Sequence, residues 1–256
     1  MKIQDFKYFF FDLDNTLIRW NDTLIGAEDL IYTLKDKNKQ VFYHTDNTLL
    51  SRQEYAEKLT EQGIPAEKQD VMTSGYVAAK KLEQKETTKT YAVGESGITK
   101  ELEETGVKIV EDAENAVIGF DRQFNYDKIK RIHKILDNGG KAYLCSNEKT
   151  FNTGKTTIPH QHAINASIKS YGATELVGKP SQEFRDRFKK YFDYMVNHSI
   201  MIGDRLEDIE TGNRLGMKTA AVMSGDLTKP RIAEAEQIQT PDFGISSLHR
   251  LKNRII

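Results

Sequence analysis

Two carboxylates stand two positions apart where an apolar run near the start of the chain ends. The run Tyr8-Phe9-Phe10-Phe11 is followed directly by Asp12-Leu13-Asp14-Asn15-Thr16. Such a run is typical of a strand buried on both faces of a parallel sheet, and these sheets bind ligands at the carboxyl ends of their strands. Two acids there repel each other unless a cation or proton intervenes, which indicates a divalent metal. From this segment alone a turn is an equal alternative, because Asp, Asn and Thr often bond their own backbone.

Three more apolar runs end in polar residues, and they favour the metal interpretation over an isolated turn. With the first run included, the four strand-like ends carry, in chain order, an acid, a hydroxyl with an amide, a cation and a further acid. The residues that follow these three runs are Thr45-Asp46-Asn47, then Lys179-Pro180, then Asp204 with Asp208. His44 lies inside the second run, where a hydrogen-bonded structural histidine is the simpler interpretation.

Composition excludes several classes of protein. The 256 residues are 38% apolar and 29% charged, which is typical of a globular chain. A net charge of −1 gives no general attraction to nucleic acid or anionic lipid. Cys145 is the only cysteine, so an internal disulfide is excluded. No apolar stretch has the length of a membrane span, and the acids near the start argue against a signal peptide. We therefore expect a cytoplasmic protein without a nucleic acid or membrane partner.

Strand, helix and strand alternate at both ends of the chain. Ser51 and Glu54 have the spacing of a capping box, which predicts a helix directly after the Thr45 strand. A second helix is predicted from Arg205 to Gly216, followed by a strand over residues 218–223. This alternation predicts an α/β fold with a Rossmann-like, doubly wound parallel sheet.

The middle of the chain predicts an inserted domain. Asp14 to Thr45 is the length of one βαβ unit, whereas Thr45 to Lys179 is far longer. Candidate strands in this interval cover residues 90–94, 107–110, 116–120 and 141–145, and Ile129, Ile132 and Leu136 form a helical apolar stripe. We predict core segments at residues 1–76 and 179–256, with a smaller α/β cap domain at 77–178.

These motifs resemble those of the haloacid dehalogenase-like (HAD) hydrolases. The matching features are DLDNTL, the strand end with Thr45, Gly-Lys-Pro, and Gly-Asp with a second Asp nearby. The late insert, with YAVGESGITKELEETGV and AVIGFDRQFNYDKI, is similar to the C2-type cap of the NagD, 4-nitrophenyl phosphatase and phosphoglycolate phosphatase subgroup. The resemblance implies a phosphatase for small phosphorylated metabolites such as sugar, polyol or glycolate phosphates, with 4-nitrophenyl phosphate as an artificial substrate.

The resemblance also implies roles for individual residues. Asp12 would attack the phosphorus and form an aspartyl-phosphate, and Asp14 would act as general acid and then general base. Lys179 would neutralise developing charge, while Thr45 and backbone N–H groups would hold phosphoryl oxygens. Asp46 and Asn47 would belong to the same substrate-binding site. The implied cofactor is Mg²⁺, bound by the Asp12 side chain, the Asp14 carbonyl and Asp204, with Asp208 as a ligand or as support.

Some residues depart from the family pattern. Asp46 stands where Asn is usual before Asn47, and Leu49 replaces a frequent basic residue. The acidic loop is one residue short, so either Glu207 or Asp208 could support the metal, and the register favours Asp208. In the cap, Pro159-His160-Gln161-His162 replaces a Pro-Gly-x-Gly turn. We expect His160 and His162 to contact the leaving part of the substrate.

Three other functions use similar residue types. A receiver-like signalling domain also combines acids, Thr and Lys, but its metal acids precede the acceptor strand and it lacks such an insert. A phosphomutase of the same superfamily would carry a helical cap between the first two motifs, and a phosphotransferase is the related alternative. A non-catalytic phosphate-binding protein is the third alternative. The sequence leaves the natural substrate and a homo-oligomer open.

Overall fold

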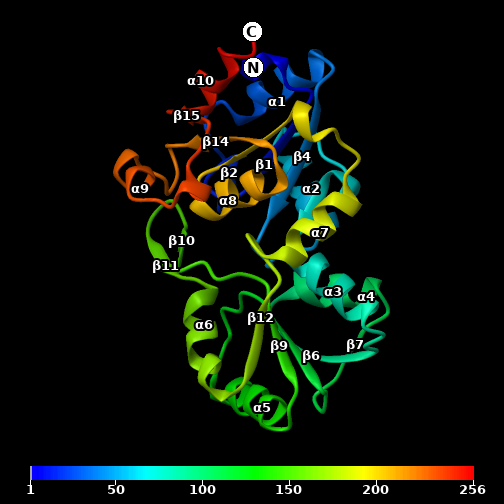
Figure 1. Cartoon of the computed structure of the whole chain (residues 1–256). Coiled ribbons are helices and arrows are strands. Elements are labelled where there is room, and N and C mark those ends of the chain that lie inside the picture. Colours follow the sequence, from blue (N-terminus) through cyan, green and yellow to red (C-terminus); the bar gives the residue numbers. More distant parts are fainter. Residues whose placement is uncertain (1) are drawn as a thin grey trace. The chain divides into compact units, whose positions relative to one another are not determined.

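The computed structural model describes residues 2–256, which divide into two compact units (Figure 1). Unit 1 contains the chain up to Thr45 together with Ala56–Val71 and Phe188–Ile256, and unit 2 contains Asp46–Tyr55 and Met72–Arg187. The domain boundaries expected after residues 76 and 178 stay a prediction. Within the described residues, no helix combines the length and the apolarity that a bilayer span requires.

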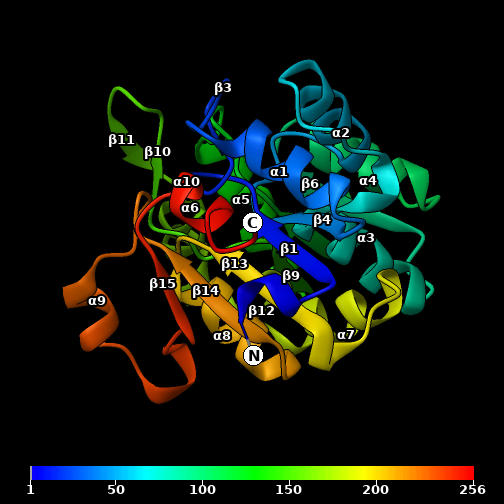
Figure 2. The same ribbon diagram turned by 90° about the horizontal axis from the view of Figure 1, so that it is seen from above.

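A six-stranded sheet with the order β15-β14-β13-β1-β4-β5 organises unit 1. Figure 2 shows β15, β14, β13, β1 and β4 side by side in this order. Strand β1 pairs in parallel with β13 on one side and β4 on the other, so Phe11 lies opposite both Ile202 and Tyr43. This arrangement confirms the predicted doubly wound α/β fold. The strands are β1 (Tyr8–Asp12), β4 (Gln40–Thr45), β5 (Val71–Thr73), β13 (Ser199–Gly203), β14 (Lys218–Val222) and β15 (Phe243–Ile245).

Helices and a small hairpin complete this part of the chain, and two of the helices, α2 and α7, contribute residues to both units. The predicted capping box is confirmed, because the Ser51 N–H donates to the Glu54 carboxylate at 2.8 Å and the Glu54 N–H donates to Ser51 Oγ at 3.3 Å. The elements are β2 (Ile18–Arg19), β3 (Asp22–Thr23), α1 (Ala27–Asp36), α2 (Arg52–Glu61), α7 (Gln182–Tyr191), α8 (Leu206–Leu215), α9 (Lys229–Ala233), α10 (Leu248–Lys252) and the 3₁₀ turns Ile3–Asp5, Lys68–Asp70, Val196–His198 and Gln237–Gln239.

An aromatic cluster anchors β1 in the core of unit 1. Phe10 is fully buried, and its ring centroid lies 5.1 Å from that of Phe42 and 4.8 Å from that of Phe188. The rings of Phe192 and Tyr194 contact Phe10 at 5.3 and 5.2 Å. Burial of these rings fixes the strand that ends at Asp12.

A second parallel sheet, with the order β12-β9-β8-β6-β7, lies in unit 2. Helices α5 and α6 cover one face, where Ile132, Leu136 and Ile168 pack with the buried strand residues, as the apolar stripe predicts. The elements are α3 (Ser74–Gln84), β6 (Lys89–Val93), α4 (Ser96–Glu104), β7 (Lys108–Ile109), β8 (Asn115–Ile118), α5 (Tyr126–Asp137), β9 (Lys141–Leu144), β10 (Thr150–Asn152), β11 (Thr157–Pro159), α6 (Gln161–Ile168), the 3₁₀ turn Lys169–Tyr171 and β12 (Ala173–Leu176).

Phe10→Ala should lower the free energy of unfolding of unit 1 by about 3–5 kcal/mol, because a buried ring is removed and the surrounding rings cannot fill its volume. Trp20 is the only tryptophan and lies in unit 1, so its fluorescence during urea denaturation measures this change. Tyr32→Ala is the matched control, since Tyr32 is 51% exposed, and it should change stability by less than about 0.5 kcal/mol. Equal losses in the two variants would show that the aromatic cluster does not anchor β1.

Candidate active site

Three neighbouring strands of the six-stranded sheet end in polar residues. Asp12 is the last residue of β1, Thr45 is the last residue of β4, and Asp204 directly follows β13. The strands are parallel and adjacent, so their carboxyl ends meet at one edge, as the sequence predicts. The fourth predicted strand end differs, because β12, which precedes Lys179, belongs to the five-stranded sheet of unit 2.

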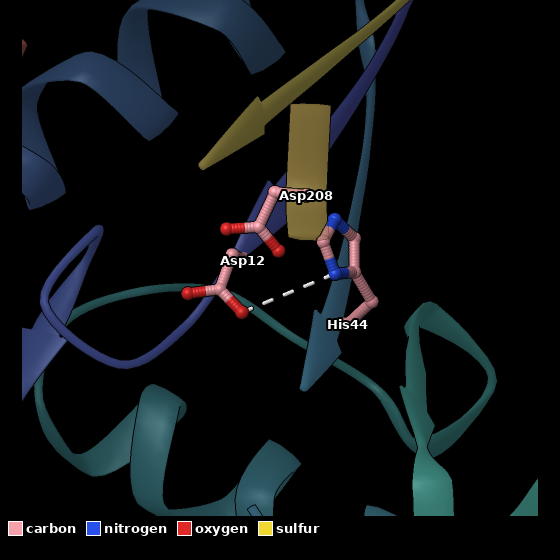
Figure 3. A group of neighbouring side chains, drawn as sticks. All are labelled: Asp12, His44 and Asp208. Carbon is pink, nitrogen blue, oxygen red and sulfur yellow. Dashed lines mark ion pairs between the residues drawn. The ribbon is translucent and has the colours of Figure 1, made fainter. Parts of the chain in front are cut away.

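Asp12, His44 and Asp208 gather at this edge (Figure 3). One possible ligand atom from each of the three side chains lies within 4.8 Å of the others, and all three residues are buried. The two carboxylates turn toward each other, while the His44 ring faces Asp12 with 4.0 Å between its Nδ1 and Asp12 Oδ1. The arrangement can hold a cation between oxygen and nitrogen donors.

His44 is the residue of this group whose position the sequence analysis missed. Its place within an apolar strand favours a structural role when the sequence alone is considered. The register supplies the missing information, since His44 is the direct partner of Asp12 across the β1–β4 pair. Two residues that lie directly opposite each other on neighbouring strands have side chains on the same face of the sheet. The contact depends on the strand register, which no local sequence pattern encodes.

Asp14 lies in the loop between β1 and the β2–β3 hairpin. The hydroxyl of Thr45 donates to Asp14 Oδ2 at 3.4 Å, which brings together the first two predicted motifs. Lys58 of α2 donates to the Trp20 carbonyl at 2.6 Å. Burial lowers the pKa of Lys58, and the charges of Asp14 and Asp22 oppose this effect. The sequence analysis did not identify this nearby positive charge.

Asp204 is completely buried in the loop after β13. Its Oδ1 accepts the Thr16 hydroxyl at 3.3 Å, and its Oδ2 accepts the Asp226 N–H at 2.7 Å. Burial raises the pKa of Asp204, Arg205 opposes the rise, and the charge of Asp208 adds to it. The ionised form of Asp204 is therefore costly here unless a cation lies beside it.

Asp208 is placed by the first turn of α8. Its Oδ2 accepts the Arg205 N–H at 3.1 Å, which satisfies a donor at the start of the helix. Gly203 makes this approach possible, because a Cβ there would lie 2.2 Å from Asp208 Oδ2. Asp208 is fully buried and belongs to the group with Asp12, whereas Glu207 is half-buried and does not.

The remaining residues predicted for the phosphate site lie in unit 2. Both carboxylate oxygens of Asp46 accept the backbone N–H of Lys179, at 3.1 and 3.0 Å, and both residues are buried. Asn47 Oδ1 accepts the Leu49 N–H at 3.0 Å, which closes a turn directly after the Thr45 strand. Asp46 thus connects two predicted motifs that are far apart in the sequence.

The two cap histidines occupy different environments in unit 2. His160 is 1% exposed, and its ring lies 4.2 Å from that of Phe120 and 5.7 Å from that of Phe151. His162 is half-buried and contacts Asn147 through Nδ1 at 3.2 Å. His162 therefore has the surface that a substrate contact needs, while the observed surroundings of His160 are those of a core residue. The substrate contacts expected of both stay predictions.

The donor set of unit 1 fits a hard divalent cation. Asp12, Asp204 and Asp208 supply carboxylate oxygens, which such cations prefer, and the raised pKa of Asp204 indicates a charge that a cation would stabilise. Asp12 and Asp208 already lie together, and Asp14 offers a backbone carbonyl in the same loop region.

Two family models match the chain. The model of haloacid dehalogenase-like hydrolases matches residues 9–108, and a second model, of HAD-hydrolase-like proteins, matches residues 176–251. The first match includes the Asp12, Asp14 and Thr45 motifs, and the second includes Lys179, Asp204 and Asp208.

Individual relatives match along nearly the whole chain. The 5′-nucleotidase YutF of Bacillus subtilis is 27% identical over 96% of this chain and 97% of its own. Phosphoglycolate phosphatase 1A of Arabidopsis thaliana is 28% identical over 96% of this chain and 76% of its own. The crystal structure of a 4-nitrophenylphosphatase from Thermotoga maritima superposes with a TM-score of 0.89 at 26% identity, covering 99% of both chains.

Asp204→Asn should abolish stabilisation by a divalent cation, because an amide carries no charge to balance the ion. With Mg²⁺ as the probe at about 100 times its Kd, a bound cation stabilises a protein by about 2.7 kcal/mol. We expect Mg²⁺ to raise the melting temperature of chelator-treated wild type and of the control Asp242→Asn, whose carboxylate pairs with Lys218 instead. An equal rise in Asp204→Asn would exclude this residue from the cation site.

Proposed function

We propose that this chain, which belongs to the haloacid dehalogenase-like hydrolases and is a phosphomonoester hydrolase, is a Mg²⁺-dependent phosphatase of small metabolites. The proposed reaction passes through an aspartyl-phosphate on Asp12. The observation that carries this proposal is the gathering of Asp12 and Asp208 at the carboxyl ends of buried parallel strands, with Asp14 bonded to Thr45 beside them. The names of the relatives, which denote phosphatases of a nucleotide, of phosphoglycolate and of 4-nitrophenyl phosphate, support small phosphomonoesters as the substrate class.

Asp12 is the proposed nucleophile. Its carboxylate oxygen attacks the phosphorus, the bond from phosphorus to the ester oxygen breaks, and an acyl phosphate forms on Asp12. A water then attacks this acyl phosphate, which releases inorganic phosphate and restores the carboxylate. The rigid attachment of Asp12 to the end of β1 supports this role, because a nucleophile held in one geometry reacts without an ordering cost.

Asp14 is the proposed general acid and base. In the first step it donates a proton to the leaving oxygen, and in the second step it removes a proton from the attacking water. The Thr45 hydroxyl that donates to Asp14 Oδ2 supports this role, since it holds the carboxyl group in one orientation.

Two positive charges are proposed to balance the phosphate. Mg²⁺ would be held by Asp12, the Asp14 carbonyl and Asp204, supported by Asp208, and when bound it would neutralise charge that develops on the phosphoryl oxygens. The Lys179 ammonium would contribute a second charge, as its motif implies. The hydrogen bonds from the Lys179 N–H to Asp46, the residue directly after Thr45, support a shared role for these two motifs.

The test is a phosphate-release screen with sugar, polyol, glycolate, nucleotide and 4-nitrophenyl phosphates in the presence of Mg²⁺. We expect release from several of the small esters, loss of release with a chelator, and recovery when Mg²⁺ is restored. Asp12→Asn keeps the shape of the side chain but removes the nucleophile, so its turnover should fall to the background rate. Full turnover in Asp12→Asn would exclude the covalent mechanism.

The same screen distinguishes hydrolysis from transfer. When an alcohol such as glycerol is added, a phosphotransferase would form a new phosphate ester at the expense of inorganic phosphate, which phosphorus NMR detects. We expect inorganic phosphate as the main product, because an Asp at the position of Asp14 can activate water.

Asp14→Asn should slow both chemical steps by about 10²–10⁴-fold, the usual contribution of general acid–base catalysis, while the affinity for Mg²⁺ changes little. The measurement is kcat across aryl phosphates of different leaving-group pKa. The wild type should depend weakly on that pKa and the variant steeply, since the unassisted oxygen must leave as an anion. Parallel dependences would show that another residue donates the proton.

A further inference from the structure

The loop that carries Lys179 is held tightly in unit 2. It runs from the end of β12 at Leu176 to the start of α7 at Gln182. Asp46 accepts the Lys179 N–H with both carboxylate oxygens, and a Cβ on Gly178 would lie 1.9 Å from the Cys145 carbonyl oxygen. The backbone at Gly178 therefore has no room for a side chain, and the backbone N–H of Lys179 is held by Asp46.

Lys81, which lies outside this loop, forms ion pairs with acids at both ends of the loop. Lys81 of α3 lies 3.3 Å from the Glu175 carboxylate in β12 and also pairs with Glu183 in the first turn of α7. Glu175 precedes Lys179 by four residues and Glu183 follows it by four. Lys141 of β9 adds a contact to Glu175 at 3.0 Å.

The ion pair between Lys81 and Glu183 is less exposed to solvent than an ordinary surface pair. The side chains of Lys81 and Glu183 are only 18% and 16% exposed. Although desolvation lowers the pKa of Lys81, the hydrogen bonds and charges of Glu183 and Glu175 outweigh it, so the pKa is raised and the ammonium stays charged. An isolated exposed pair contributes little to stability, whereas charges that form a network contribute more, and Lys81 joins two acids on separate elements.

We propose that Lys81 is a positioning residue for the hydrolysis, because it bridges Glu175 and Glu183 at the two ends of the Lys179 loop and so fixes where the Lys179 ammonium lies. This inference rests on the proposed role of Lys179 in neutralising the phosphate. In the proposed mechanism, Lys81 contacts neither the substrate nor the cation, and its only role is to hold the Lys179 loop in position.

The experiment compares variants of the full chain loaded with Mg²⁺. Lys81→Met keeps most of the length of the unbranched side chain and removes its charge, whereas Lys81→Arg keeps the charge. Lys80→Met is the matched control, since Lys80 is the adjacent residue and pairs with Glu83 of its own helix, at 2.8 Å. Glu183→Gln removes one half of the bridge and serves as a second variant if Lys81→Met does not fold. Circular dichroism establishes the fold of each variant.

The readouts are the affinity for inorganic phosphate, measured by calorimetry, and kcat/KM for 4-nitrophenyl phosphate. We expect Lys81→Met and Glu183→Gln to weaken both by about fivefold or more, a typical coupling between linked residues. Lys81→Arg should restore most of the loss, and Lys80→Met should match the wild type. Unchanged phosphate affinity in both Lys81→Met and Glu183→Gln would overturn the inference.

A double-mutant cycle separates positioning from a general structural effect. Lys179→Ala should weaken phosphate binding strongly, and adding Lys81→Met to it should cause no further loss, because the group that Lys81 positions is already gone. Equal losses in the two backgrounds would overturn the inference alone. If Lys179→Ala leaves phosphate affinity unchanged, the proposed role of Lys179 is wrong and the role of Lys81 falls with it.

Discussion

The crowding of negative charge at the ends of buried parallel strands is the constraint on which the rest of unit 1 depends. Asp12, Asp204 and Asp208 are almost completely buried, and removing a carboxylate from water costs several kcal/mol unless other groups replace the lost hydration. The structure supplies hydrogen-bond donors for this purpose, including the N–H groups of Arg205 and Asp226. A bound cation would complete the balance of charge, because the burial that makes the ionised acids costly also favours their binding of a cation.

Each acid of unit 1 is positioned by a short local element on a rigid sheet. Asp12 ends a strand that is anchored by aromatic packing around Phe10, and Asp208 lies in the first turn of α8, where a negative charge is favoured by the helix dipole. Asp14 follows in a loop and is bonded to Thr45. Strand ends and helix starts leave little freedom to these side chains, which is what preorganised catalysis at a phosphoryl group requires.

In unit 2, the departure from the family pattern at Asp46 has a physical explanation. A buried carboxylate needs strong donors, and the Lys179 N–H bonds to both of its oxygens. The carboxylate that Asp46 adds to this motif therefore accepts a hydrogen bond from the backbone of the Gly-Lys-Pro motif. Nearby Cys145 is buried, which raises the pKa of its thiol, and the charge of Asp46 adds to this rise. A buried thiol with a raised pKa stays neutral, so Cys145 is a core residue and not a nucleophile.

The sequence by itself determined the features that depend on residues close together in the chain. These are the apolar strand that ends at Asp12, the capped helix after Ser51, the parallel α/β fold and the order of the motifs, because burial patterns and capping are local properties. Only the tertiary structure decided that β12 belongs to the five-stranded sheet, that His44 faces Asp12, that Asp208 and not Glu207 joins Asp12, and that His160 is enclosed by phenylalanines. Strand order, register and side-chain packing join residues far apart in sequence, and no local pattern encodes which of several compatible partners will meet.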